Sequence, residues 1–207
     1  MNRYLTASPH PDAICHRVVH GGDTLRAPTR LTAAVRDEIR ALAALAPLHN
    51  PVALEWIEAA ARTLPEAPTA AVFDTAYYAD LPPRAAAYAL PRALADEMRL
   101  RRFGFHGIAH RAMWERWCAL RPDLRHGGRL ISIQLGGGCS ITAVHDGRPL
   151  DTSMGFSPVE GLVMATRSGD VDPSIVTYLM RRRGLSADAV DELLNERAGL
   201  LGLAGTG

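Results

Sequence analysis

Residues 129–147, RLISIQLGGGCSITAVHDG, have the pattern of two strands joined by a turn of three consecutive glycines. The first strand is expected over residues 129–135 and the second over 140–145, and Asp146 with Gly147 predicts a tight turn after them. Glycines lack a Cβ, so their backbone N–H groups can converge on an anion, although many hairpins turn on glycines for steric reasons alone. Taken by itself, this stretch leaves both interpretations open.

On either side of this stretch, strand and helix patterns alternate, as is typical of an α/β architecture. Further short strands are expected at residues 15–19 and 70–73, and Pro47 should end a helix over residues 32–46. The other expected helices cover residues 50–62, 108–120, 174–183 and 187–197. The Pro- and Ala-rich stretch 81–91 is the expected domain junction.

The composition of the 207 residues argues against several classes of protein. A net charge of +1 gives no electrostatic basis for a nucleic-acid or membrane-surface partner. Cys15, Cys118 and Cys139 are too few and too scattered for a disulfide framework or a zinc site, and they indicate free thiols in a reducing compartment. The first sixteen residues lack the apolar core of a signal peptide, and no apolar run is long enough to span a membrane. A cytoplasmic protein is expected.

A second informative stretch follows the glycine turn, DTSMGFSPVEGLVMATRSGDVDP at residues 151–173. Here Arg167 lies among small hydroxyl and glycine residues, where a guanidinium can approach phosphate or carboxylate with a bidentate fork. The alternative is a surface loop in which Arg167 only pairs with Asp170 or Asp172. The Asp172-Pro173 pair should begin the next helix.

His106 lies in the string FGFHG, and His110 follows four residues later. That spacing would suit two metal ligands on one helix face. However, Gly107 places His106 before the helix and no third ligand is evident, so no metal site is expected within this chain. A histidine held between glycines and flanked by aromatic residues is better placed to donate a hydrogen bond to a transferring phosphoryl group.

Three further candidates lie at element ends, and each is ambiguous by itself. Arg17 ends the first strand near the Gly21-Gly22 turn. His49 precedes a helix that Asn50 should cap, where an anion could also be received. Asp74 follows a strand, a usual place for functional carboxylates in α/β folds.

Six ordered strings together resemble the acetokinase (acetate kinase) family. They are HRVVHGG (16–22), LAPLHNP (45–51), VFDTA (72–76), RRFGFHG (101–107), LGGG (135–138) and the stretch at 151–173. The resemblance implies an α/β, actin- and sugar-kinase-like (ribonuclease H-like) two-domain fold, incomplete at both ends. Residues 1–77 would belong to the N-terminal acetokinase domain, and residues 78–207 would open the C-terminal one.

The resemblance also implies an activity. It is the reversible, Mg²⁺-dependent phosphorylation of acetate by ATP, giving acetyl phosphate and ADP by direct in-line transfer, usually in a homodimer. The implied catalytic residues are Arg17, Asp74, His106 and Arg167. The two arginines would bind the substrate and the phosphoryl group. His106 would stabilise the transition state, and Asp74 would position a metal or an arginine. Val19, Leu48, Phe105 and Pro158 resemble the pocket for the acetate methyl, His49 a second active-site histidine, and Gly136, Gly137 and Gly138 the phosphate loop.

The chain departs from the family pattern at the glycine turn, where Gln134 and Gly137 replace a histidine and an asparagine. Two side-chain contacts to ATP are therefore expected to be lost. Nothing like the family's first strand and phosphate turn precedes Arg17, and the adenosine- and metal-linked residues would lie beyond Gly207, so slow turnover is expected of the chain alone. Two alternatives stay open: propionate or another short-chain acid as the substrate, and a non-catalytic remnant that binds nucleotide or serves as a dimerisation partner.

Overall fold

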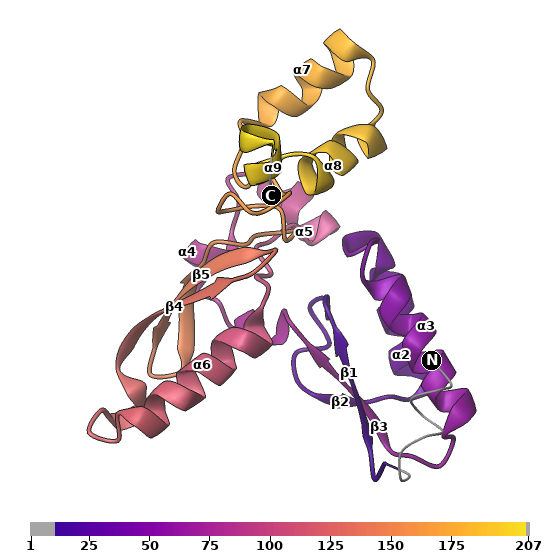
Figure 1. Ribbon diagram of the computed structural model, residues 1–207, viewed down its shortest axis with the longest axis vertical. Helices are drawn as coiled ribbons and strands as arrows, with labels where there is room; N and C mark the ends of the chain where they lie inside the picture. The colour runs from indigo at the N-terminus through magenta and orange to yellow at the C-terminus, as the bar shows by residue number, and fades with distance from the viewer. Residues whose placement is uncertain (1–10, 206–207) are drawn as a thin grey trace. The chain divides into compact units, whose positions relative to one another are not determined.

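The computed structural model of the protein describes residues 11–205 (Figure 1). The first ten residues and the last two lie outside the described residues, and with them parts of the N-terminal segment assessed for a signal peptide and of the glycine-rich C-terminal stretch. The chain divides into two compact units, residues 1–79 and 80–207. The assignment of residues 1–77 and 78–207 to parts of two acetokinase domains stays a prediction.

The first unit is a three-stranded sheet with helices packed against it (Figure 1). Its elements are β1 (Ile14–Val18), β2 (Thr29–Arg30), α2 (Ala33–Ala41), the 3₁₀ helix η1 (Leu42–Leu45), α3 (Asn50–Thr63), β3 (Thr69–Phe73) and the 3₁₀ helix η2 (Ala76–Tyr78). Strand β3 is central, parallel to β1 and antiparallel to β2. A parallel pair needs a long crossover, which α2 and α3 provide.

The core of the first unit forms between α2, α3 and the sheet. Ile39 of α2, Ile57 of α3 and Val18 of β1 are among its fully buried members. The helix expected over residues 32–46 is shorter than predicted, because α2 ends at Ala41 and one turn of 3₁₀ helix follows. Ala46 precedes a proline, which disfavours the α conformation, and the last turn tightens before it.

Asn50 does not cap α3, and that prediction was wrong. His49 occupies the N-cap position, and Asn50 is the first helical residue. The Asn50 amide is used elsewhere: its Oδ1 accepts from the His20 backbone N–H at 3.2 Å, and its Nδ2 donates to the His20 carbonyl at 3.1 Å. Both residues are fully buried. This reciprocal pair satisfies polar groups that would be costly to bury alone, and it ties the loop after β1 to the start of α3.

The second unit is built on an antiparallel sheet in the order β4-β5-β6, with α6 beside β4 (Figure 1). Its strands are β4 (Arg129–Leu135), β5 (Cys139–His145) and β6 (Arg148–Thr152); its helices are α4 (Pro83–Ala86), α5 (Arg92–Met98), α6 (Gly107–Leu120), the 3₁₀ helix η3 (Arg125–Gly127), α7 (Pro173–Arg183), α8 (Ala187–Glu196) and α9 (Gly199–Ala204). The predicted glycine hairpin is confirmed, with Leu135 paired to Cys139 across the turn. Strand β6 was missed; its Pro149 is tolerated because β6 is an edge strand.

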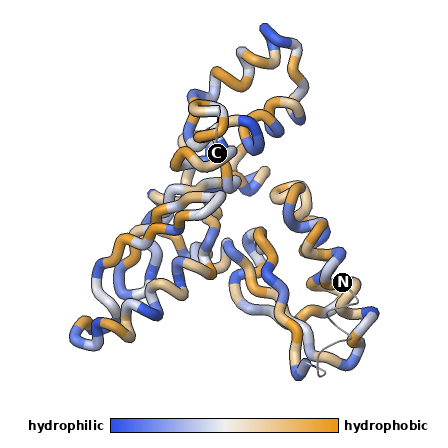
Figure 2. Tube along the Cα trace, in the orientation of Figure 1, coloured by the Kyte–Doolittle hydropathy of each residue, from blue (hydrophilic) through white to orange (hydrophobic). Residues whose placement is uncertain are grey.

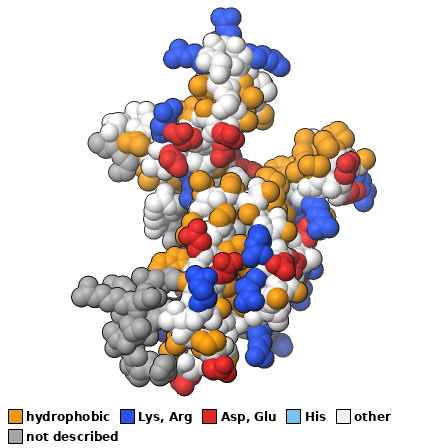
Figure 3. Space-filling view, turned by 90° about the vertical axis from the view of Figure 1, so that its right-hand side faces the viewer, with side chains coloured by type: hydrophobic (Ala, Val, Ile, Leu, Met, Phe, Trp, Pro, Cys, Tyr) orange, Lys and Arg blue, Asp and Glu red, His pale blue; other side chains and the backbone are white. Residues whose placement is uncertain are grey.

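Helices α7 and α8 pack against each other. As predicted, Asp172 begins α7: its side chain accepts from the Ser174 N–H at 2.8 Å, and a proline follows it. The last turn of α7 carries Arg181, Arg182 and Arg183. The end of this helix is hydrophilic in Figure 2, and Lys or Arg side chains gather at the top of Figure 3. Cations at a helix C-terminus complement the helix dipole, and Gly184 then ends the helix in the left-handed conformation.

We expect the first unit to lose stability in acid because of His20. Burial lowers the pKa of His20 from 6.5 to about 4, and its Nδ1 accepts from the Gly22 N–H at 3.0 Å. Between these two pH values the unfolded state binds more protons than the native state, so the free energy of unfolding falls as the pH falls. Protonation of His20 should lower the free energy of unfolding by on the order of 3 kcal/mol. Thermal unfolding from about pH 7.5 to about pH 4 measures the loss.

The control for this prediction is His20→Asn, whose amide oxygen can accept the same N–H without titrating. The variant should show a flatter dependence of melting temperature on pH. His110 in the second unit, whose pKa is also lowered to about 4, titrates in both proteins, so the difference isolates His20. Parallel profiles for the two proteins would contradict the prediction.

Candidate active site

The first group of predicted site residues lies at the carboxyl ends of β1 and β3. Arg17 is paired with Val72 in the sheet, and Asp74 follows β3 directly. The Arg17 guanidinium donates to the Asp74 carboxylate through Nε at 3.2 Å and Nη2 at 2.5 Å. The hydrogen bond to Asp74 raises the pKa of Arg17. The Asp74 side chain is 3% exposed and that of Arg17 is 58% exposed, so a buried carboxylate orients a guanidinium that is still open to solvent.

The remaining predicted residues of the first unit lie close by in sequence and differ in exposure. Val19, next after β1, is buried, whereas Leu48 is 52% exposed. His49 is half-buried at the start of α3, and its side chain does not cap the helix. Of these residues, only Val19 is packed into the unit, directly beyond the strand that carries Arg17.

The second group of predicted residues surrounds the glycine turn between β4 and β5. A Cβ placed on Gly138 would lie 3.1 Å from His106 Cε1 and 3.2 Å from Arg167 Nη1, so the Gly138 backbone passes directly against both side chains. His106 is the N-cap of α6 with φ of 58°, which confirms that it precedes the helix. The turn, the histidine and the arginine, widely separated in sequence, therefore meet at one place.

Arg167 is not held by a carboxylate. Its Nη1 lies 3.4 Å from the Pro158 carbonyl oxygen, and it makes no ion pair with any residue in the described range 11–205. Asp170 accepts from the Gly161 N–H and Asp172 caps α7, so the alternative that Arg167 pairs with either aspartate is wrong. Partial burial lowers the pKa of Arg167. A partly desolvated cation whose contacts are only with neutral acceptors favours the arrival of an anion.

Backbone contacts from the α8–α9 segment hold the turn that carries Arg167. The Leu200 N–H donates to the Met164 carbonyl at 2.9 Å. Gly199 has φ of +60°, and a Cβ there would come within 2.7 Å of the Arg167 carbonyl oxygen, so a side chain does not fit. This role of Gly199 was not predicted from the sequence, where its only signal is a glycine at the start of a short helical pattern.

The glycine turn offers fewer backbone donors than predicted. The Gly136 N–H is committed to the Gly138 carbonyl at 2.9 Å, so not all three N–H groups can converge on an anion. The Gly137 carbonyl accepts from the Ala165 N–H at 3.3 Å, which ties the turn to the segment carrying Arg167. Within residues 11–205, the N–H groups of Gly137 and Gly138 donate to no other group of the chain. Two donors thus remain for a ligand.

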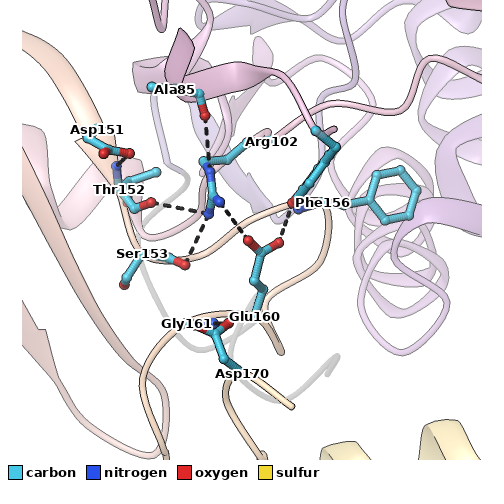
Figure 4. A network of polar contacts seen from close by, with 10 residues as sticks. Ala85, Arg102, Asp151, Thr152, Ser153, Phe156, Glu160, Gly161 and Asp170 are labelled. Atoms are coloured by element: carbon cyan, nitrogen blue, oxygen red, sulfur yellow. Dashed lines mark hydrogen bonds and ion pairs between the residues drawn. The ribbon is translucent and has the colours of Figure 1, made fainter. Parts of the chain in front are cut away.

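An ion pair that the sequence analysis missed joins the segment before His106 to the loop over residues 152–161 (Figure 4). Arg102 Nη2 donates to Glu160 Oε1 at 2.6 Å, and its Nη1 donates to the carbonyls of Thr152 and Ser153 at 3.3 and 3.2 Å. Both charged side chains are largely buried. Breaking such a pair leaves an uncompensated buried charge, so it fixes the loop.

Tyr88 completes this network through hydrogen bonds to Glu160 and Phe156. Its hydroxyl donates to the second oxygen of Glu160 and accepts from the Phe156 N–H at 2.7 Å. Burial, helped by the hydrogen bond to Glu160, raises the pKa of Tyr88, which keeps the hydroxyl protonated as a donor. Arg102 and Glu160 each lie in a string that resembles the family, but no local pattern indicates that they pair.

Two absences bear on the expected partners. Within residues 11–205, no three side chains of His, Cys, Asp or Glu lie close enough to hold a metal ion. No helix in that range is both long and apolar enough to cross a membrane.

Known structures share this fold. A propionate kinase from Francisella tularensis subsp. tularensis SCHU S4 superposes with a TM-score of 0.94 at 41% identity, covering 99% of this chain and 54% of that chain. The acetate kinase of Porphyromonas gingivalis superposes with a TM-score of 0.87 at 40% identity, covering 97% and 50%. The predicted actin- and sugar-kinase-like fold is therefore confirmed, and it is the fold of these two kinases.

The family follows from the sequence comparisons. The model of the acetokinase family matches residues 5–207, and the chain belongs to this family. The acetate kinase of Clavibacter michiganensis subsp. michiganensis (strain NCPPB 382) is 50% identical over 197 residues, which make up 95% of this chain and 50% of that relative. The resemblance drawn from the six strings is thus confirmed, and the chain spans about half the length of the curated relatives it matches.

Gly155→Ala should destabilise the second unit because its Cβ would overlap the Glu160 carboxylate and the Tyr88 hydroxyl. We expect a loss of about 2 kcal/mol or more, as forced overpacking and a broken buried pair produce. The matched control is Gly137→Ala, where a Cβ meets nothing within 4 Å and φ is not positive. It should change the free energy of unfolding by less than about 1 kcal/mol. Denaturant titration compares the two, and equal losses would refute the prediction.

Proposed function

We propose that this chain carries the acid- and phosphoryl-binding groups of an acetate kinase, which transfers phosphate reversibly between ATP and acetate. The observation that carries the proposal is the convergence of His106 and Arg167 on the glycine turn, with Arg167 free of any carboxylate in the described range. Membership of the acetokinase family and 50% identity to an acetate kinase support the choice of reaction. Residues 1–77 and 78–207 would belong to its N- and C-terminal domains.

The proposed reaction needs no general base. Acetate is ionised at pH 7, so a carboxylate oxygen attacks the γ-phosphorus while the bond from that phosphorus to the ADP oxygen breaks. The obstacle is repulsion between two anions. Arg17 and Arg167 would offset this repulsion and hold the groups in line, and His106 would donate a hydrogen bond to the transferring phosphoryl group.

The contacts of Asp74 and of the glycine turn support their proposed roles. Asp74 would act as a positioning residue, since its carboxylate is already committed to Arg17. The two remaining N–H groups of Gly137 and Gly138 would bind a nucleotide phosphate. Mg²⁺, as the proposed cofactor, would neutralise phosphate charge when bound, but the described residues supply no ligand cluster for it. A cytoplasmic homodimer is the proposed setting.

Val19, Leu48, Phe105 and Pro158, with His49, would form the acetate site. The choice of acid is the finer part of the proposal, and propionate is the second candidate because a solved propionate kinase is 41% identical with a TM-score of 0.94. The test measures formation of acyl phosphate, trapped as the hydroxamate, with ATP and a series of acids from acetate to butyrate. Highest kcat/KM with acetate supports the first candidate, and highest kcat/KM with propionate supports the second.

Titration with ATP in a calorimeter addresses the third possibility, a non-catalytic remnant. ATP binding without acyl phosphate formation from any acid would favour it over both kinases.

Arg167→Ala should lower kcat for acetyl phosphate formation by about a hundredfold or more, because a preorganised charge at the transferring group is lost. Arg183→Ala is the matched control, since this arginine lies exposed in the last turn of α7 and should be neutral. Steady-state hydroxamate assays with the two variants give the comparison. Unchanged turnover in Arg167→Ala would remove the proposed role of this arginine.

A further inference from the structure

A chain of buried hydrogen bonds runs from His106 into the second unit. His106 Nδ1 lies 2.9 Å from Ser140 Oγ, and the same oxygen lies 2.8 Å from His110 Nε2. His110 Nδ1 in turn lies 2.8 Å from Ser132 Oγ. His110 and Ser140 are fully buried, and Ser132 is 4% exposed. The proposed function uses only the outer end of this chain.

The outer end of the chain is the second nitrogen of His106. A Cβ on Gly138 would be 3.2 Å from His106 Nε2 and 3.2 Å from Arg167 Nη1. Nε2 is therefore turned toward the glycine turn and the unpaired guanidinium, while Nδ1 is occupied by Ser140. In its neutral form a histidine side chain carries one N–H, on either Nδ1 or Nε2.

Ser140 Oγ could accept from both histidines, but its own buried hydrogen would then have no acceptor among residues 11–205, so counting hydrogens leaves the chain two possible directions. A neutral imidazole has one donor and one acceptor nitrogen, and a hydroxyl has one hydrogen to donate. In the first direction Ser132 donates to His110, His110 to Ser140 and Ser140 to His106 Nδ1, which leaves the hydrogen of His106 on Nε2. Burial lowers the pKa of His110 to about 4, so it stays neutral near pH 7 and can both donate and accept.

In the opposite direction every bond is reversed, and the hydrogen of His106 lies on Nδ1. That chain would end with Ser132 donating to Met113 Sδ at 3.5 Å, a weak acceptor. It would also present a lone pair of Nε2 to an anionic phosphoryl oxygen, which is repulsive. An anion in the site therefore favours the first direction, in which each bond also polarises the next.

We propose that Ser140 and His110 are positioning residues that hold His106 as the tautomer protonated on Nε2, so that this N–H is directed at a bound phosphoryl group. The consequence for catalysis rests on the proposed function, whereas the tautomer does not depend on it. Ser140 acts through His106 without contacting the reacting atoms, and His110 acts through Ser140.

The first test reads the tautomer directly. Nitrogen-15 spectra of histidine-labelled protein near pH 7, with saturating inorganic phosphate, distinguish a protonated Nε2 from a protonated Nδ1, and His106→Gln assigns the signals. We expect protonation on Nε2, and a signal for protonation on Nδ1 would overturn the proposal. Ser140→Ala should give a mixture of tautomers, and an unchanged spectrum in that variant would equally overturn it.

The control variants separate positioning from general loss of structure. Thr142→Val removes another fully buried hydroxyl from β5, one that lies 3.0 Å from the Thr152 hydroxyl, and should leave the His106 tautomer unchanged. Ser140→Thr keeps a hydroxyl and should restore the wild-type spectrum. If Thr142→Val altered the His106 signals as much as Ser140→Ala does, the effect would be one of packing and the proposal would fail.

The second test is kinetic. Ser140→Ala and His110→Gln should lower kcat by about ten- to a hundredfold with KM for ATP and acetate changed less than about threefold, because a misdirected donor affects the transition state most. If no variant or wild type forms acyl phosphate while the tautomer results hold, the proposed function fails and the positioning stands. If turnover is normal in Ser140→Ala, the positioning role fails and the proposed function stands.

Discussion

The second unit depends on one close approach, that of the Gly138 backbone to His106 and Arg167. A Cβ at this position would lie 3.1 Å from His106 Cε1 and 3.2 Å from Arg167 Nη1, so both side chains would have to shift to admit it. The β4–β5 hairpin delivers the glycine, the left-handed residue before α6 turns the histidine toward it, and the turn buttressed by Gly199 delivers the arginine. Three segments from distant parts of the chain thus meet at a glycine where an added methyl group would press against both side chains.

Three arginines, Arg17, Arg102 and Arg167, differ in how their positive charge is compensated. Arg17 is paired with the buried carboxylate of Asp74, and Arg102 with the half-buried carboxylate of Glu160. Arg167 is partly buried with no carboxylate partner among residues 11–205, an arrangement that disfavours folding and favours anion binding. An unpaired charge at a ligand site lowers the stability of the folded protein but serves its function, a common trade-off in proteins.

The sequence predicts those features that depend on neighbouring residues. The glycine hairpin and the Asp172 cap were found because turn and cap chemistry is local. Asn50 was misjudged because its amide bonds to His20, thirty positions away, in place of the helix it begins. The Arg102–Glu160 pair, 58 positions apart, has no local signature at all. Partner choice for buried polar groups is decided by tertiary packing, which single-sequence patterns do not contain.

The backbone of His106 narrows the mutational routes open to this position. With φ of 58° it adopts a conformation that few residues other than glycine accept readily, with asparagine and aspartate the main exceptions. A replacement of His106 must therefore meet two requirements: it must keep the hydrogen-bonding chemistry, and it must accept a backbone with positive φ. Divergence at this position in descendants of the chain should be confined to asparagine, aspartate and glycine, whereas β-branched replacements should be eliminated even where catalysis is no longer under selection.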